Sequence, residues 1–269
     1  MTPLILLSIA GSDCSGGAGI QADIKTISAL GGYAATVITA VTAQNTLGVQ
    51  AVHPLPADVV RSQILSVMDD LQPAAVKIGM VHNAAIVQVI AQCLQKYRPG
   101  FIVYDPVMIS TSGRRLMTEE TMLTIQEELF PLCTLITPNL SEASMLTGQS
   151  ISTPVEMEQA ARLLSRRYHT AILIKGGHLQ GNEMCDVLCT YPSTACQLYT
   201  SSKIESSNLH GTGCTLSSAI ATFLAYGHSL DEAVRRAKNY IDTAIRNGSG
   251  LNIGHGNGPL WHFPIRVPQ

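Results

Sequence analysis

Charged and aromatic residues are both scarce in this sequence: Asp, Glu, Lys and Arg make up 13% of the 269 residues, and Phe, Trp and Tyr make up 5%. The formal net charge of −2 gives no electrostatic reason to bind nucleic acid or an anionic membrane. The shortage of aromatic rings also removes the side chains on which bases would stack. We therefore expect no nucleic-acid partner and no membrane partner.

Cysteine motifs and metal-binding patterns are missing as well. The seven cysteines include no Cys-x-x-Cys motif, and the eight histidines include no metal-binding pair at helical spacing. Cys185, Cys189 and Cys196 fall in expected strands and are interpreted as reduced packing residues. The opening apolar run, residues 4–10, is too short to span a membrane and has no basic segment before it. We therefore expect a protein of the reducing cytoplasm.

Strand-like and amphipathic helical segments alternate along the whole sequence. Short apolar or β-branched segments predict strands at residues 4–9, 34–43, 74–80, 101–107, 134–136 and 171–174. Apolar residues at helical spacing predict helices at residues 20–30, 59–71, 83–96, 118–130 and 154–168. Repeated strand–helix units are typical of a mostly parallel sheet with helices on both faces. Because no linker, internal repeat or low-complexity stretch interrupts the pattern, we expect residues 1–269 to form one α/β domain.

Two helix starts carry clear capping signals. Thr153-Pro154-Val-Glu156 combines an N-cap, a proline at the first helical position and a glutamate three residues after the cap. Ser229-Leu-Asp-Glu232 predicts a second capping box, opening a helix that runs to about Arg246 and ends at Asn247-Gly248.

A glycine-rich turn, His210-Gly-Thr-Gly-Cys-Thr215, precedes an expected helix at residues 216–224. A helix start carries partial positive charge and unpaired N–H donors, and glycine lets an anion approach the backbone closely. A thiol at position 214 would lose its proton there more readily than in open water. The turn thus suggests phosphoryl transfer. The alternative interpretation is a tight turn followed by a small buried cysteine.

Glycines and polar residues follow the expected strands, and ligands of open α/β sheets bind at the carboxyl ends of strands. These segments are residues 11–19, 44–45, 79–80, 105–106, 137–139 and 175–178. Several of them point to one rim of the sheet. Two rival site types lack their motifs, since there is no Gly-x-x-x-x-Gly-Lys-Ser/Thr loop and no Gly-x-Gly-x-x-Gly after a strand.

The rim segments match one family in order. The matching stretches are Ala10-Gly-Ser-Asp-Cys-Ser-Gly-Gly-Ala-Gly-Ile-Gln-Ala-Asp23, Val37-Ile-Thr-Ala-Val-Thr-Ala-Gln-Asn45, Lys77-Ile-Gly-Met80, Asp105-Pro-Val-Met108, Thr137-Pro-Asn-Leu-Ser-Glu-Ala143, Lys175-Gly-Gly-His178, His210-Gly-Thr-Gly-Cys-Thr215, Gly256-Asn-Gly-Pro259 and His262-Phe263. Together they resemble the hydroxymethylpyrimidine/phosphomethylpyrimidine kinases of thiamine biosynthesis, in the ribokinase-like superfamily. Each motif alone is weak, but the ordered set is highly specific and covers nearly the whole chain.

The resemblance implies a three-layer α/β/α sandwich with a mostly parallel central sheet. It implies ATP as phosphoryl donor and Mg²⁺ as cofactor. The expected reaction phosphorylates the hydroxymethyl group of 4-amino-5-hydroxymethyl-2-methylpyrimidine and then converts that monophosphate to the diphosphate. Members of the family are commonly homodimers, so a homodimer is expected here.

The resemblance also implies roles for the residues of the glycine-rich turn and the substrate pocket. Cys214 stands where relatives in the superfamily carry an aspartate base, and the N–H groups of Gly211, Thr212, Gly213 and Cys214 would hold the equatorial oxygens of the transferring phosphoryl group.

Gln44 would pair its side-chain amide with the amine and ring nitrogen of the aminopyrimidine, and Asp23 would meet the polar edge of the substrate. Gly11 would allow close approach, with Met80 and Val107 as apolar walls. The ordinary alternatives are a strand-end Gln bonded to backbone, a solvated or capping Asp, and core packing for Met80 and Val107.

For the nucleotide, the implied residues are Lys175, Asn139 and Thr212, and for the metal they are Glu142 and Asp105. Mg²⁺ favours hard oxygen ligands, often through water. The competing interpretations are a helix cap with an acidic first turn for Asn139 and Glu142, and an exposed strand-end lysine for Lys175. Asp105 either supports the metal or holds its turn.

Two other functions compete with this one. A vitamin B6 (pyridoxal/pyridoxine) kinase has the same architecture, and Gln44 argues against it as the main role. A non-catalytic ligand-binding protein on the same fold is the more remote alternative. One departure from the family bears on the second phosphorylation: Ser206-Ser207-Asn208-Leu209 stands where Thr-Lys-Asn-Thr is more usual.

Overall fold

The computed structural model describes residues 3–108, 117–177, 179 and 183–263, and its central feature in that part of the chain is a nine-stranded sheet. The strands are β1 (Ile5–Asp13), β2 (Tyr33–Asn45), β3 (Gly48–Pro54), β4 (Ala75–Ile78), β5 (Phe101–Tyr104), β6 (Leu135–Ile136), β7 (Ala171–Ile174), β8 (Glu183–Cys189) and β9 (Cys196–Ser202). Their order is β3-β2-β1-β4-β5-β6-β7-β8-β9. The central pairs are parallel, and β3, β8 and β9 pair antiparallel at the two edges.

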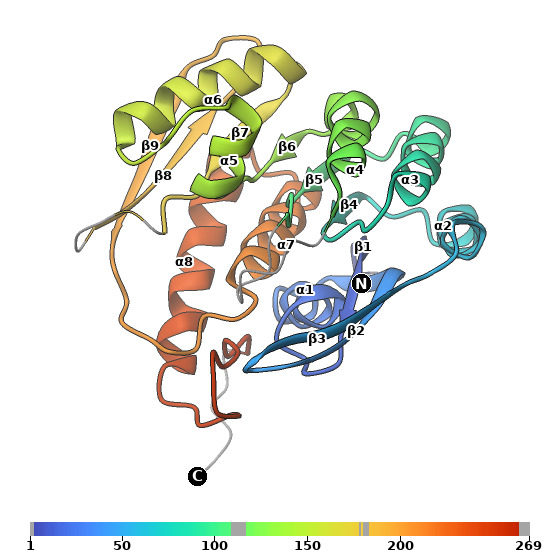
Figure 1. Ribbon diagram of the computed structural model, residues 1–269, viewed down its shortest axis with the longest axis horizontal. Helices are drawn as coiled ribbons and strands as arrows, with labels where there is room; N and C mark the ends of the chain where they lie inside the picture. Colours follow the sequence, from blue (N-terminus) through green and yellow to red (C-terminus); the bar gives the residue numbers. More distant parts are fainter. Residues whose placement is uncertain (1–2, 109–116, 178, 180–182, 264–269) are drawn as a thin grey trace.

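Helices cover both faces of this sheet (Figure 1). They are α1 (Gly19–Ala29), α2 (Ala57–Asp70), α3 (Ala84–Tyr97), α4 (Glu119–Thr124), α5 (Leu140–Thr147), α6 (Pro154–Tyr168), α7 (Thr212–Ala225) and α8 (Leu230–Gly248). One hydrophobic core packs α2–α6 against one face, and a second packs α1, α7 and α8 against the other. We call these the α3 face and the α7 face. The arrangement confirms the predicted three-layer α/β/α sandwich.

Alternation along the central strands decides which side chain faces which layer. In β1, Leu7 and Ile9 join the core of the α3 face, whereas Leu6 joins that of the α7 face. In β4, Val76 and Ile78 likewise face α3. Lys77, between them, therefore points toward α7 although it is fully buried.

The helix signals were largely correct. Thr153 and Glu156 form the predicted capping box of α6. At Ser229 only half of the box forms: its hydroxyl accepts from the Glu232 N–H, but the Glu232 carboxylate contacts Arg235 and Arg236 instead.

One strand was missed, and two element predictions were wrong in detail. The edge strand β3 was not foreseen, because its mostly exposed residues show no apolar alternation. The helix expected at residues 118–130 is α4 followed by a π-helical turn, Ile125–Leu129, and a 3₁₀ turn, Phe130–Leu132. Helix α7 begins at Thr212 rather than at residue 216, so Gly213 and Cys214 belong to its first turn. None of the described helices is long and apolar enough to cross a membrane.

Candidate active site

The first turn of α7 leaves backbone N–H groups at its start without acceptors among the described residues. Its N-cap, Gly211, has φ = 88°, and a Cβ added there would lie 1.9 Å from the carbonyl oxygen of Gly17. Only glycine fits this left-handed, crowded position. The N–H groups of Thr212 and Thr215 donate to the carbonyls of Leu209 and Gly211. Gly213 and Cys214 lie between Thr212 and Thr215, and the glycine cap supplies no side-chain acceptor for their backbone N–H groups. These two N–H groups can therefore bind an anion.

The N-terminus of α1 meets the same point. The backbone N–H of Gly19, the first residue of α1, lies close enough to the Cys214 sulfur to favour its thiolate form. A Cβ on Gly19 would lie 2.2 Å from the Gly11 carbonyl oxygen, so the loop between β1 and α1 also needs glycine. Two helix starts thus add their partial positive charges beside one thiol.

The titration of Cys214 runs against the sequence-based expectation. Burial raises the pKa of the Cys214 thiol to about 11, although the nearby Lys77 ammonium acts in the opposite direction. The expectation of easier proton loss was therefore wrong for the protein without ligands. It considered only the local helix start, whereas the surrounding layers remove the water that would stabilise a thiolate.

An ion pair lies directly beside Gly213. The Lys175 Nζ and Asp105 Oδ1 atoms are 2.5 Å apart, and the Thr137 hydroxyl donates to the same oxygen at 3.2 Å. A Cβ on Gly213 would lie 3.0 Å from Asp105 Oδ2 and 3.3 Å from Lys175 Nζ. The structure thus brings Lys175, expected at the nucleotide, and Asp105, expected at the metal, to the start of α7.

Asn139 and Glu142 form a capping box at the start of α5, which is the helix-cap interpretation of their spacing. The Glu142 carboxylate accepts from the N–H of Asn139 at 2.8 Å and from that of Met108 at 3.3 Å. Burial raises the pKa of Glu142 to about 7, with Lys175 opposing and Asp105 adding to the rise.

Glu142 and Asp105 do not form a complete metal-binding site by themselves. The described residues contain no group of three or more His, Cys, Asp and Glu side chains that could hold a metal ion. Glu142 accepts from the N–H of Met108, three residues after Asp105, so two carboxylates lie near one another at the rim. Such a pair suits Mg²⁺ that is held largely by phosphate oxygens and water, with carboxylates as supplementary ligands.

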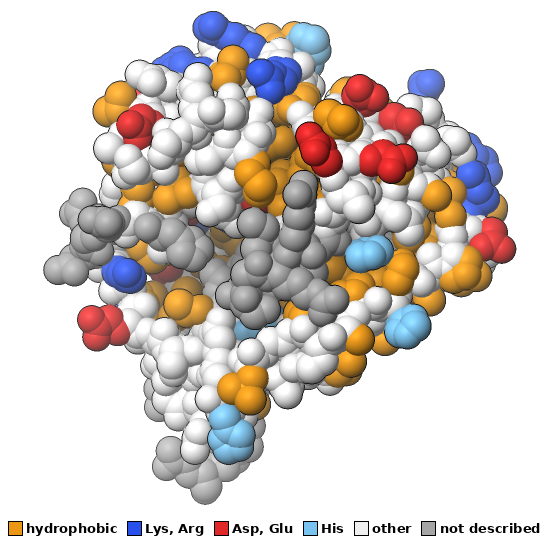
Figure 2. Space-filling view, in the orientation of Figure 1, with side chains coloured by type: hydrophobic (Ala, Val, Ile, Leu, Met, Phe, Trp, Pro, Cys, Tyr) orange, Lys and Arg blue, Asp and Glu red, His pale blue; other side chains and the backbone are white. Residues whose placement is uncertain are grey.

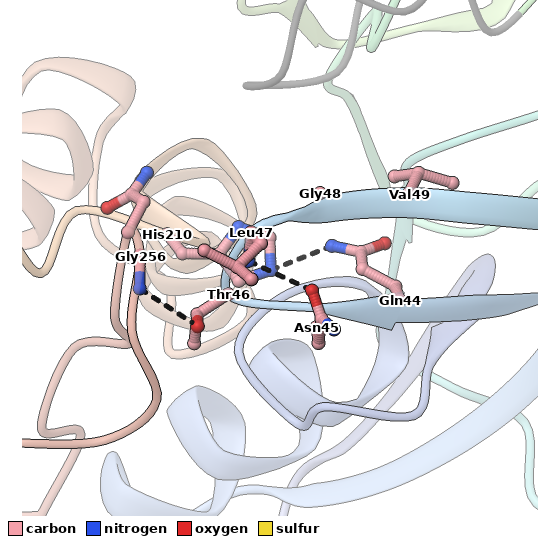
Figure 3. A pocket seen from close by; sticks show the side chains of 9 residues that line it. Gln44, Asn45, Thr46, Leu47, Gly48, Val49, His210 and Gly256 are labelled. Atoms are coloured by element: carbon pink, nitrogen blue, oxygen red, sulfur yellow. Dashed lines mark hydrogen bonds between the residues drawn. The ribbon is translucent and has the colours of Figure 1, made fainter.

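Gln44 lines a cavity of about 250 Å³ between the β2–β3 hairpin and the segment near the C-terminus (Figure 3). Residues 44–49 form one wall, and His210, Gly256 and Asn257 form the other. The Gln44 amide nitrogen lies 2.9 Å from His210 Nε2. The Cys14 thiol contacts the backbone of Gln44: its sulfur lies 3.2 Å from the carbonyl oxygen and 3.3 Å from the backbone nitrogen.

Asp13 organises the loop that follows β1. Its carboxylate accepts from the N–H groups of Ser15 and Ala18, from the Ser15 hydroxyl and from His210. Burial alone would raise the pKa of Asp13, but the hydrogen bonds from His210 and Ser15 lower it to about 2. The charged carboxylate therefore ties this loop to the start of α7.

Asp23 lies deeper than the sequence suggested. It is fully buried, and both of its oxygens contact Lys77 Nζ, at 2.8 and 2.9 Å. Ser8 and Ser218 donate hydroxyl protons to it as well. Its side chain thus belongs to a closed polar cluster under Cys214 rather than to the wall of the cavity.

The expected apolar walls lie at the same rim. A Cβ on Gly11 would be 2.5 Å from the Met80 Cε atom, so Gly11 makes room for that side chain. Val107 is half-buried two residues after Asp105, whose carbonyl oxygen accepts its N–H. His178, from the Lys175-Gly-Gly-His178 motif, lies outside the described residues.

Sequence reasoning passed over three residues of this region: Asp13, His210 and Lys77. All three stand inside the quoted motifs, but Asp13 and His210 meet across 197 positions and gave no pairing signal. Lys77 offered a clearer sign, because a charged residue within a buried strand needs a partner.

A mostly parallel α/β/α sandwich of ribokinase-like fold, with an anion-binding helix start and a lysine–aspartate pair beside it, defines a phosphotransferase. The chain belongs to the phosphomethylpyrimidine kinase family, whose sequence model matches residues 13–261.

Individual relatives and solved structures are similar to this chain along nearly its whole length. The hydroxymethylpyrimidine/phosphomethylpyrimidine kinase of Rhizobium meliloti is 48% identical over 260 residues, covering 96% of this chain and 97% of the relative. The crystal structure of phosphomethylpyrimidine kinase from Clostridium difficile 630 matches with a TM-score of 0.80 at 44% identity, covering 90% of this chain and 99% of that one. An ADP complex of Bacillus subtilis pyridoxal kinase matches with a TM-score of 0.89 at 33% identity, covering 97% and 98%.

Proposed function

We propose that this protein transfers the γ-phosphoryl group of ATP to the hydroxymethyl group of 4-amino-5-hydroxymethyl-2-methylpyrimidine, with Mg²⁺ on the nucleotide. Relatives named as hydroxymethylpyrimidine/phosphomethylpyrimidine kinases support the substrate class. Solved neighbours in complex with ADP or AMP-PCP support the nucleotide. We also propose the phosphorylation of the monophosphate to the diphosphate, which is the second half of those relatives' names.

The observation that carries the proposal is the convergence of α1 and α7 on Cys214, with Lys175 and Asp105 alongside. Phosphoryl transfer requires little covalent chemistry from a protein and depends mainly on positioning and on stabilising charge. The N–H groups of Gly213 and Cys214 face the place where negative charge develops. Lys175 supplies a full positive charge to the phosphates.

Within this arrangement, Cys214 would receive the proton of the attacking hydroxyl. Because its pKa is raised, the resting thiol is protonated and must first release its proton to solvent; Lys77 and the two helix starts would favour the thiolate that then accepts the hydroxyl proton. Glu142 and Asp105 would hold Mg²⁺ through water and phosphate oxygens, and the ion would neutralise phosphate charge. Asn139 and Thr212 would contribute contacts to the nucleotide near the same corner.

A substrate panel tests the proposal directly. The purified protein is given ATP and Mg²⁺ with the pyrimidine alcohol, its monophosphate, pyridoxal or pyridoxine, and the products are separated by charge. We expect the pyrimidine alcohol to be used with the highest kcat/KM. Absence of ATP consumption with both pyrimidines would refute the proposal.

Vitamin B6 kinase activity is the second candidate, as a side activity beside the pyrimidine reaction. The matched pyridoxal kinases overlay with TM-scores of 0.87 to 0.89 at 30–33% identity, so backbone geometry does not separate the two substrates. Gln44 would then set the preference: Gln44→Met is expected to lower pyrimidine turnover far more than pyridoxal turnover. Equal losses would contradict that role.

Two further expectations stay predictions. The single domain of residues 1–269 is supported by one uninterrupted sheet order. The homodimer rests on the family resemblance, and analytical ultracentrifugation tests it.

A further inference from the structure

Three polar side chains from distant segments meet beside the cavity, and two of them, Gln44 and His210, line it. Asp13 ends β1, Gln44 lies near the end of β2, and His210 immediately precedes the cap of α7. His210 Nε2 lies 2.8 Å from Asp13 Oδ2 and 2.9 Å from the Gln44 amide nitrogen. The side chains of His210 and Asp13 are only 9% and 4% exposed, so water cannot take the place of a poorly matched partner.

The hydrogen bonds at His210 fix where its proton lies. Asp13 is ionised at neutral pH and can only accept, and its oxygens already take three other donors. His210 Nε2 must therefore carry a hydrogen and donate it. A ring nitrogen that carries a hydrogen cannot accept from the NH₂ group of Gln44. The amide end that faces His210 should accordingly be the oxygen, which can share the single Nε2 hydrogen with Asp13 in a three-centre hydrogen bond.

The other end of the Gln44 amide leads to the same conclusion independently. The Thr42 hydroxyl lies 3.0 Å from the carbonyl oxygen of Ser12 and 3.3 Å from the far end of the Gln44 amide, where the oxygen is placed. A hydroxyl has a single proton, and the Ser12 carbonyl can only accept, so that proton goes to Ser12. The amide end near Thr42 must then donate, which makes it the NH₂ group.

The two ends of a primary amide exchange places by a half-turn of the side chain, and the hydrogen-bond network decides which orientation holds. We propose that His210, with Asp13 and Thr42, is a positioning residue that holds Gln44 with its oxygen toward the imidazole and one N–H free for the cavity. A ligand is then recognised through an acceptor atom. For the aminopyrimidine this atom is the ring nitrogen next to the amine-bearing carbon, not the amine itself.

This inference rests on the proposed function for its choice of substrate, but its first test does not need turnover. Nitrogen-15 NMR of the histidine-labelled protein reports which ring nitrogen of His210 carries hydrogen, with His210→Gln used to assign the resonance. We expect a protonated Nε2. A bare Nε2 would overturn the inference, whether or not the protein phosphorylates the pyrimidine.

The second test measures recognition with two substrate analogues. One replaces the ring nitrogen next to the amine-bearing carbon with CH, and the other lacks the amine. In His210→Leu, which removes the N–H donor, Gln44 is free to turn, and the ratio of kcat/KM for the two analogues should change by about tenfold toward the CH analogue. His210→Gln keeps an N–H donor at the same distance from Cβ and should retain the wild-type ratio.

Both analogues are measured on one preparation, so their ratio does not depend on how much protein is folded. The matched control is His53→Gln, at an exposed position on β3, which should leave the ratio unchanged. A ratio that stays within about twofold in His210→Leu would overturn the inference. If wild type used neither the parent pyrimidine nor the analogues, the proposed function would fail, and the NMR result would still decide the orientation of Gln44.

Discussion

The two faces of the central sheet use the same strands for different purposes. On the α3 face, β1 and β4 present only apolar side chains: Leu7, Ile9, Val76 and Ile78. On the α7 face, the intervening positions Ser8 and Lys77 are polar and fully buried. A second buried pair, Lys238 with Asp186, lies on this face as well, and Asp186 also accepts the Gly176 N–H at 2.8 Å.

The difference shows where this protein accepts a cost in stability. Each buried charge on the α7 face must be desolvated, and an apolar replacement of similar volume is often as stable or more so. The cluster of Lys77, Asp23, Ser8 and Ser218 lies below Cys214 and below the anion-binding turn, so its charges act on the reacting corner. The α3 face supplies packing, and the α7 face adds electrostatic positioning.

Figure 2 shows one face of the molecule, with several acidic side chains gathered at its upper right, basic side chains mainly at its top and right edge, and hydrophobic side chains exposed between them.

The largest expected effect comes from the thiol at the α7 face. Cys214→Ala should lower kcat by about 10²–10⁴-fold, the usual contribution of a proton-transfer group, while binding of nucleotide and pyrimidine stays nearly unchanged. Steady-state kinetics and calorimetry measure the two quantities. The matched control is Cys93→Ala, a buried free cysteine on the α3 face, which should leave kcat unchanged. Unchanged turnover in Cys214→Ala would reduce the thiol to a packing role.

The next effect concerns stability. Asp23→Ala leaves Lys77 buried without its counter-ion and should lower the free energy of unfolding by about 3–5 kcal/mol. Urea denaturation measures the loss. The double variant Asp23→Leu with Lys77→Met should recover most of it but not the activity. A loss below about 1 kcal/mol in Asp23→Ala would mean that the ion pair does not control folding.

The third prediction concerns how the stability of the protein depends on pH through Glu142. Its pKa is raised from 4.5 to about 7, so the folded state binds the proton more tightly than the unfolded chain. This contribution to stability is complete below about pH 4.5 and is lost as the pH rises through 7. Between pH 5 and pH 8, the free energy of unfolding should fall by about 2 kcal/mol more in wild type than in Glu142→Gln. Thermal melts of both proteins test this, and parallel curves would contradict the assignment.

The smallest effect is expected on the apolar α3 face. Ile78→Val removes one buried methyl group and should cost about 0.5–1.5 kcal/mol of stability. Because Ile78 points away from Lys77 and Cys214, kcat/KM should not change. A clear fall in kcat/KM, measured beside a urea titration, would show that the two faces are coupled through the strand.

Local signals in the sequence located most elements, because they depend on neighbours along the chain. The Thr153 cap, the adjacent proline and Glu156 fixed the start of α6, and the spacing of apolar residues predicted α1, α2 and α3 within a few residues. The failures were also local. The glycines at positions 211 and 213 suggested a longer loop, but only Gly211 adopts the left-handed conformation, and the helix starts immediately after it.

The site was only partly accessible from the sequence. The residues themselves indicated the glycine-rich turn, and the resemblance named Lys175, Asp105 and Gln44. The structure places the turn, Lys175 and Asp105 at one corner and Gln44 at the cavity wall. The resemblance gave no means to see that Asp23 is enclosed by Lys77, or that His210 connects Asp13 with Gln44. Those contacts join residues 54, 197 and 166 positions apart, beyond the reach of any helical or strand period.

By itself, the sequence determined the alternation of strands and helices, the caps, the family and the position of the anion-binding turn, since each depends on short-range geometry or on ordered motifs. Tertiary structure alone decided the titration of Cys214 and Glu142, the enclosure of Asp23 and the surroundings of Gln44. The physical reason is that desolvation and hydrogen-bond partners depend on which layers close over a group. That closure depends on the packing of the whole chain.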